Sequence, residues 1–104
     1  MRISLAAILL TLFGSNAFAD DAVTVPDMSQ LSWQADSSGR IYLRNLSQFN
    51  PQFLACCYNH YIDTTTADGK AKWSGALAYI AVGKSMTIFV SNKSQPGPVT
   101  LLMN

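Results

Sequence analysis

The sequence predicts an all-β domain, a small antiparallel β-sandwich of six or seven strands. β-branched, hydroxyl and aromatic residues are abundant, and the chain contains no glutamate, which exposed helix positions commonly use. Several segments alternate apolar and polar residues with a period of two, and turn residues recur about every ten positions. An immunoglobulin-like sandwich is the preferred form and a small barrel the alternative, although the Cys…Trp…Cys spacing of antibody domains is absent.

The first part of the chain has the organisation of a secretory signal peptide. Arg2 precedes an apolar run over residues 3–13, and Ala17 and Ala19 place small residues where signal peptidase requires them. The run is shorter than the roughly 20 apolar residues that span a membrane, so no stable anchor is expected after cleavage. We therefore predict a signal peptide at residues 1–19, a single β domain at residues 20–104, and a periplasmic or secreted location.

The first half of the predicted domain alternates between strands and turns. Residues 20–28 should form an extended arm, because they contain a proline. Period-two alternation predicts strands at residues 30–35 and 40–47, separated by an Asp-Ser-Ser-Gly turn at residues 36–39. Alternation continues over residues 53–66 and predicts a long strand there.

The second half contains one ambiguous segment. Residues 67–70 include an Asp-Gly pair, which is a hairpin signal and predicts a turn. Residues 71–82 could be strand or helix: their alanines permit a helix, but the glycines within and after them favour two short strands or an irregular connection. Strands are expected at residues 85–90 and 99–103, the second of which closes the sheet.

Cys56 and Cys57 are the only cysteines, and they are adjacent. A bond between adjacent cysteines cannot join distant segments, and on a strand their side chains would point to opposite faces. Three interpretations remain open. The favoured one is free thiols, with Cys56 packed in the core; the others are a homodimer bridged through Cys57 and a vicinal disulfide that acts as a redox-sensitive turn.

His60 lies near the cysteines and raises the possibility of a metal or redox centre. Cys56, Cys57 and His60 are weak candidate ligands, since thiolates and imidazoles bind soft metal ions. On a straight strand, however, Cys56 and His60 are about 13 Å apart, too far to share one ion. We therefore expect no metal or cofactor, and interpret His60 as a packed strand residue.

Catalytic motifs and charged patches are both missing from the sequence. It contains no nucleophile motif such as Gly-x-Ser-x-Gly and no glutamate for paired-carboxylate chemistry, so we predict that the protein is not an enzyme. Acidic and basic residues balance once Arg2 is removed, which argues against a nucleic-acid partner.

Aromatic residues supply the remaining candidates for a binding site. Tyr42, Phe49, Phe53, Tyr61 and Trp73 fall on polar strand faces, near loops, or in the ambiguous segment. The preferred function is an exported, non-enzymatic binding module that contacts another protein, as an inhibitor, an immunity-type protein or an accessory subunit. The alternatives are a carbohydrate-binding domain that uses exposed aromatics and a metal or redox protein.

Overall fold

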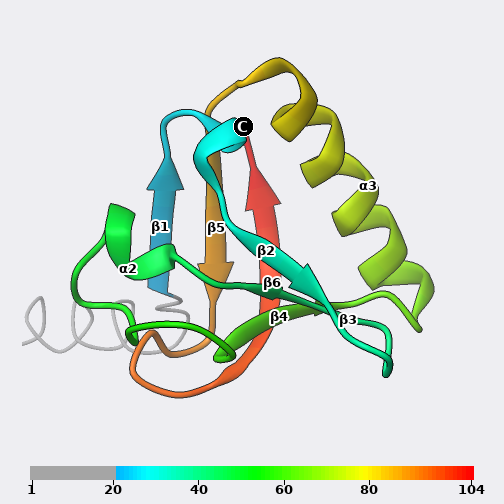
Figure 1. The fold of residues 1–104 in the computed structure, drawn as a ribbon, viewed down its shortest axis with the longest axis horizontal. Helices are drawn as coiled ribbons and strands as arrows, with labels where there is room; N and C mark the ends of the chain where they lie inside the picture. Colours follow the sequence, from blue (N-terminus) through cyan, green and yellow to red (C-terminus); the bar gives the residue numbers. More distant parts are fainter. Residues whose placement is uncertain (1–20) are drawn as a thin grey trace, which may run out of the picture.

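The computed structural model describes residues 21–104, and six strands in this part of the chain form one open sheet (Figure 1). The signal peptide predicted at residues 1–19 lies outside the described residues. The strands are β1 (Asp21–Val25), β2 (Trp33–Ala35), β3 (Arg40–Leu43), β4 (His60–Asp63), β5 (Met86–Val90) and β6 (Gly97–Met103). Their order across the sheet is β1-β5-β6-β4-β3-β2.

The sheet is mixed. Four of the neighbouring pairs are antiparallel, whereas β4 and β6 are parallel and pair only at His60↔Gly97 and Tyr61↔Pro98. Parallel neighbours need a long crossover connection, which here consists of a helix and β5. The prediction of a strand-rich chain is therefore confirmed, but the structure does not show the predicted antiparallel sandwich or barrel, because all six strands belong to one layer.

The helix α3 (Ala67–Val82) occupies the segment for which a turn and short strands were favoured, and that prediction was wrong. Thr66 caps the start of the helix: its hydroxyl oxygen accepts a hydrogen bond from the backbone N–H of Gly69 at 2.9 Å. Gly83 ends it in the left-handed conformation, with φ of 68°. The Asp-Gly pair that suggested a hairpin lies in the first turn of the helix.

The core lies between one face of the sheet and a layer of helices. The residues of α3 that pack on the core recur at helical spacing, and they are Gly69, Trp73, Ala76 and Ile80. The short helices η1 (Met28–Gln30) and α2 (Leu46–Phe49) place Met28 and Leu46 in the same core. The buried apolar residues of the sheet are Val23, Val25, Ile41, Leu43, Ile62, Met86, Ile88, Val90 and Val99.

Residues 53–59 form an irregular loop where the first half of a long strand was predicted. Only His60–Asp63 pairs as a strand. A disulfide joins Cys56 to Cys57, and this linkage is incompatible with side chains on opposite faces of an extended strand. Cys56 is exposed rather than packed in the core, and Cys57 has no free sulfur for a bridge to a second chain.

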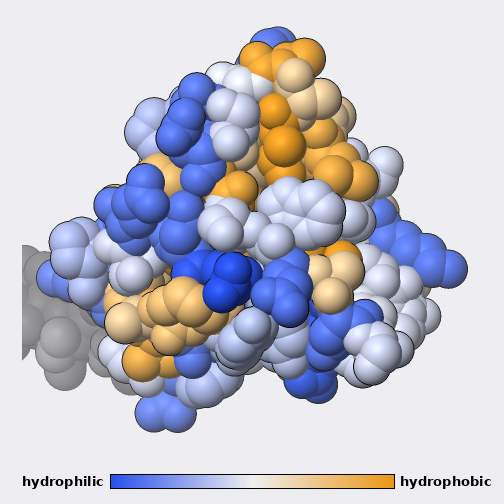
Figure 2. Space-filling model, in the orientation of Figure 1, coloured by the Kyte–Doolittle hydropathy of each residue, from blue (hydrophilic) through white to orange (hydrophobic). Residues whose placement is uncertain are grey.

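The outward side of α3 is partly apolar. Figure 2 shows hydrophobic surface over its C-terminal half, at the upper right, where Leu77 and Val82 are exposed. Within residues 21–104, no helix has both the length and the apolar character needed to cross a membrane.

Candidate binding surface

The face of the sheet that turns away from α3 carries exposed and half-buried side chains. Strand residues alternate between the two faces, so the burial of Ile41, Leu43 and Ile62 directs Tyr42 and Tyr61 outward. These two tyrosines are register partners on β3 and β4. The remaining outward-facing residues of the sheet include Thr24, Gln34, Phe89, Pro98, Leu101 and Met103.

Three tyrosines pack edge to face on this side of the molecule. The ring centroids of Tyr42 and Tyr61 are 5.7 Å apart with an interplanar angle of 63°. Tyr58, from the irregular loop, lies on the other side of Tyr42, with centroids 5.4 Å apart and an angle of 89°. Edge-to-face contacts of this kind fix ring orientation, so Tyr42 holds its two neighbours in place.

Two arginines flank the tyrosines. The Arg40 guanidinium carbon lies 4.1 Å from the centre of the Tyr61 ring, and that of Arg44 lies 5.5 Å from the centre of the Tyr58 ring. Neither arginine forms an ion pair with a carboxylate within residues 21–104. We call Arg40, Tyr42, Arg44, Tyr58 and Tyr61 the tyrosine–arginine surface.

The electrostatic environments of the two arginines differ. A hydrogen bond with the Tyr42 hydroxyl is the largest cause that raises the pKa of Arg40, and the charge of Asp63 adds to it. The Nε of Arg44 is buried and has no hydrogen-bond partner among the described residues. Arg44 also has no ion-pair partner within residues 21–104, whereas the charge of Asp63 acts on Arg40.

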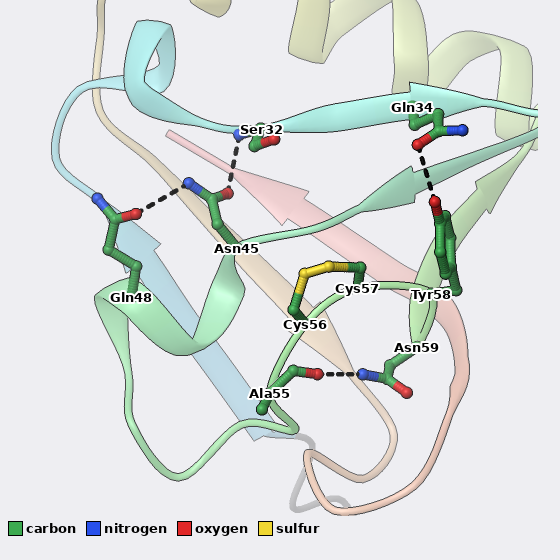
Figure 3. Close-up of a disulfide and its surroundings, with 9 residues drawn as sticks. All are labelled: Ser32, Gln34, Asn45, Gln48, Ala55, Cys56, Cys57, Tyr58 and Asn59. Carbon is green, nitrogen blue, oxygen red and sulfur yellow. Dashed lines mark hydrogen bonds between the residues drawn. A yellow bond between two sulfur atoms is a disulfide. The ribbon is translucent and has the colours of Figure 1, made fainter.

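Tyr58 is held on the surface from the loop of residues 53–59 (Figure 3). Its hydroxyl donates to Oε1 of Gln34 on β2 at 3.0 Å. Cys57 precedes it in the chain and is joined to Cys56 by the disulfide and by a cis peptide bond.

At the lower left of Figure 2, an apolar patch lies over the loop that joins α2 to β4, and hydrophilic side chains border it.

Asn45 anchors the neighbouring backbone. Its Oδ1 accepts from the backbone N–H of Ser32 at 2.8 Å, and its Nδ2 donates to Oε1 of Gln48 (Figure 3). The same Nδ2 also donates to the carbonyl oxygen of Gln30. These bonds tie the start of β2 to α2. Arg44 lies between the end of β3 and Asn45, so its backbone is held at a fixed point near Tyr58.

His60 lies inside the domain and faces away from this surface. Its side chain is 2% exposed, and Nε2 is 2.9 Å from the carbonyl oxygen of Gln95 and 3.3 Å from that of Asn92. The imidazole N–H can donate to these carbonyls, which ties β4 to the loop before β6. Among residues 21–104, no group of three or more His, Cys, Asp or Glu side chains is placed to hold a metal ion.

The five aromatic candidates separate into two groups. Tyr42 and Tyr61 lie on the tyrosine–arginine surface. Phe53 is 3% exposed in the core, Phe49 packs against that core, and Trp73 lies on α3 with its ring 4.9 Å from that of Trp33.

Sequence reasoning missed three members of the surface, Arg40, Arg44 and Tyr58. The alternation Arg40-Tyr42-Arg44 was visible on the polar side of a predicted strand. It could have indicated a cationic and aromatic face. The position of Tyr58 was not readable, because it depends on the loop replacing a strand.

A groove of about 570 Å³ lies elsewhere, between α3 and the end of β6. Gly75 and Tyr79 line it from the helix, and Leu102 lines it from the strand. Its two charged side chains, Lys72 and Asp68, form an ion pair with each other. The groove shares no residue with the tyrosine–arginine surface.

No family model matches this chain, and neither a curated protein nor a solved structure matches it.

Proposed function

We propose that this protein is an exported, non-enzymatic binding module that contacts a partner protein through the tyrosine–arginine surface. One observation carries the proposal: among residues 21–104, a sheet face that no described helix covers presents three edge-packed tyrosines and two arginines without ion-pair partners. Tyrosine and arginine are enriched among the residues that dominate protein–protein binding energy.

The charge of the surface indicates the chemistry of the partner. Asp36 and Asp63 are the carboxylates near Arg40, and each already accepts hydrogen bonds from its own turn. Around Arg44 no carboxylate lies within ion-pair distance among the described residues. A partner that offers an aspartate or glutamate side chain to Arg44 would complete a charge-assisted hydrogen bond.

A protein partner fits the ring geometry better than a sugar does. Carbohydrate platforms present flat ring faces to solvent, whereas Arg40 covers a face of Tyr61 and Arg44 lies over Tyr58. The large interplanar angles also prevent the three rings from forming one flat surface. The carbohydrate alternative therefore has less support, although Tyr42 and Tyr61 belong to its candidate set.

Export is part of the proposal, and it rests on the sequence of residues 1–19. β1 begins at Asp21, so cleavage after Ala19 would leave every described strand intact. Asp21 is itself held in the fold, because its carboxylate accepts a hydrogen bond from the backbone N–H of Lys93 at 2.6 Å and forms an ion pair with the Lys93 side chain. N-terminal sequencing of exported protein, which should begin at Asp20, tests this point.

Capture with matched variants tests the binding proposal. Immobilised mature protein is exposed to extract of the source cells, beside Arg44→Ala, Tyr58→Ala and a Lys70→Ala control on the exposed side of α3. We expect one protein to be retained by the parent and the control, and lost from both surface variants. Its retention should also weaken at high salt, because the contact includes an exposed charge.

Affinity measurement on the purified partner makes the test quantitative. Tyr58→Ala should weaken binding by at least about 2 kcal/mol, the usual threshold for a dominant interface residue. Equal retention by all four proteins, or no retained protein at any concentration, would contradict the proposal.

A redox protein is the second candidate, and the exposed Cys56–Cys57 disulfide favours it. His60 does not extend this centre, because its ring nitrogen contacts backbone carbonyls. If this is the function, the reduced protein should reduce glutathione disulfide repeatedly while a dithiol regenerates the reduced protein. Cys57→Ser should abolish this turnover. Absence of turnover would remove this candidate.

A further inference from the structure

We infer that the Cys56–Cys57 disulfide is a redox control of the tyrosine–arginine surface, and that it acts by holding Tyr58 in position. Its consequence for binding rests on the function proposed above. Its structural part, the coupling of the disulfide to the tyrosines, stands on the geometry of the loop alone.

The loop has few restraints besides the disulfide. At one end, the backbone N–H of Leu54 donates to the carbonyl oxygen of Lys93 at 3.2 Å. At the other, the carbonyl oxygen of Asn59 accepts from the N–H of Gly97, and the Asn59 side chain donates to the carbonyl oxygen of Ala55. Between these points, residues 55–58 make no backbone–backbone hydrogen bond to any other part of residues 21–104.

Tyr58 follows the disulfide directly and depends on weak contacts. Its side chain is 56% exposed, its hydroxyl makes one neutral hydrogen bond to Gln34, and its ring touches Tyr42 edge on. Arg44 lies over the same ring. Since neutral hydrogen bonds and exposed aromatic contacts are each weak, the course of the backbone through Cys57 decides whether Tyr58 stays on the surface.

The chemistry requires a dithiol as reductant. One thiolate of the dithiol attacks the sulfur of Cys56, the exposed member of the pair, and the Cys57 sulfur leaves as a thiolate that takes a proton. The second thiol of the reductant then displaces Cys56 from the mixed disulfide. In total, two electrons and two protons pass to the protein, which gains two thiols, while the reductant becomes a disulfide.

With the bond open, Cys56 and Cys57 can adopt the extended conformation that the disulfide excludes, with their side chains on opposite faces. Tyr58 would then leave Tyr42 and Gln34, and Arg44 would lose the ring beneath it. The oxidised protein presents the complete surface, and the reduced protein presents a surface without one of its three tyrosines.

Tyrosine NMR tests the structural part directly. The chain has four tyrosines, and the fourth, Tyr79, lies on α3 at the other side of the sheet and serves as an internal control. Mature protein with ¹³C-labelled tyrosine is compared before and after treatment with dithiothreitol, with assignments from single Tyr→Phe variants. Alkylation and mass measurement establish that both thiols are free in the treated sample and that neither is free in the untreated one.

We expect the ring signals of Tyr58 and Tyr42 to shift on reduction, those of Tyr79 to stay in place, and reoxidation to restore the original spectrum. The double variant Cys56→Ser/Cys57→Ser should give the reduced spectrum without reductant. Unchanged Tyr58 and Tyr42 signals in fully reduced protein would overturn the inference. Equal shifts of Tyr79 would also overturn it, because they would indicate general loosening.

Binding provides the second arm of the experiment. Reduced protein should bind the captured partner at least about tenfold more weakly than oxidised protein, a change of about 1.4 kcal/mol. Equal affinity of the two forms would contradict the inference that the disulfide controls partner binding. If the tyrosine signals shift and no partner is retained by either form, the proposed function fails while the coupling of the disulfide to Tyr58 stands.

Discussion

The two faces of the sheet differ in what their residues do, although they alternate along the same strands. On the face under α3, residues such as Ile62 and Ile88 are at most 2% exposed and pack in one continuous apolar core. On the opposite face, Tyr42, Tyr61 and their arginine neighbours are only half-buried. Stability is therefore concentrated on one face, and the other is free to carry a binding function.

This difference shows why so small a domain can support both tasks. Because the side-chain period of a strand is two, a residue and its immediate neighbour can be selected for separate purposes. β4 gives the sharpest example, since Ile62 faces the core and Tyr61, next to it, belongs to the tyrosine–arginine surface. Substitutions at neighbouring positions should therefore have different consequences.

The largest expected effect comes from comparing Ile62→Ala with Tyr61→Ala. Ile62→Ala removes a fully buried side chain and leaves a cavity, so it should lower the free energy of unfolding by about 2–5 kcal/mol. Tyr61→Ala loses only a half-buried ring and its contacts with Tyr42 and Arg40, so its cost should be about 1 kcal/mol. Urea unfolding of the two variants measures both values.

The same two variants should differ in the opposite order when partner binding is measured instead of stability. Tyr61→Ala should weaken partner binding, while Ile62→Ala should leave it unchanged under conditions where the variant is folded. Equal losses of stability at the two positions would show that the outward face is also core.

The next effect concerns how α3 is attached to the covered face, and two glycines of the helix test it. A Cβ at Gly69 would lie 1.7 Å from the carbonyl oxygen of Asp63, so Gly69→Ala must displace the start of the helix from β4. We expect a loss of about 1–3 kcal/mol, the range for overpacked sites.

Gly75→Ala is the matched control on the same helix. A Cβ there meets no atom within 4 Å, so this substitution should stabilise by about 0.5–1 kcal/mol through the higher helix propensity of alanine. Thermal unfolding of both variants distinguishes the sites. Similar changes at the two glycines would mean that α3 does not approach β4 as closely as described.

The smallest effect concerns the turns at the ends of the strands. Hydrogen bonds hold the pKa values of Asp21, Asp27, Asp36 and Asp63 below the ordinary value of 3.8. For Asp21 the main cause is the backbone N–H of Lys93; for the other three it is a hydroxyl group two residues further along the chain.

The sign of the pH dependence follows from these directions. Because the folded pKa values are lower than those of the unfolded chain, the carboxylates contribute fully above about pH 4 and lose this contribution as the pH falls through the folded values. The urea midpoint should therefore decrease between pH 5 and pH 2, and less steeply in Asp63→Asn. A midpoint that rises on acidification would contradict this account.

The sequence predicted those parts of the molecule that depend on local chemistry. Strands near residues 40–43 and 86–90 follow from alternation, and Gly39 and Gly83 occur at the positive φ angles that turn residues permit. Tyr42 and Tyr61 were placed on the more polar strand faces because the period of two puts them opposite Ile41 and Ile62, and both are half-buried in the structure. The signal peptide and the absence of an enzymatic activity remain predictions.

Other features were decided only by the tertiary structure. Residues 67–82 form a helix because Thr66 caps it and one side packs on the core, and these contacts outweigh the local turn and strand preferences. The parallel pairing of β4 with β6 joins segments distant in sequence, which no local pattern encodes. Tyr58 meets Tyr42 and Arg44 because the disulfide loop takes the place of a strand, so the complete surface exists only once the chain has folded.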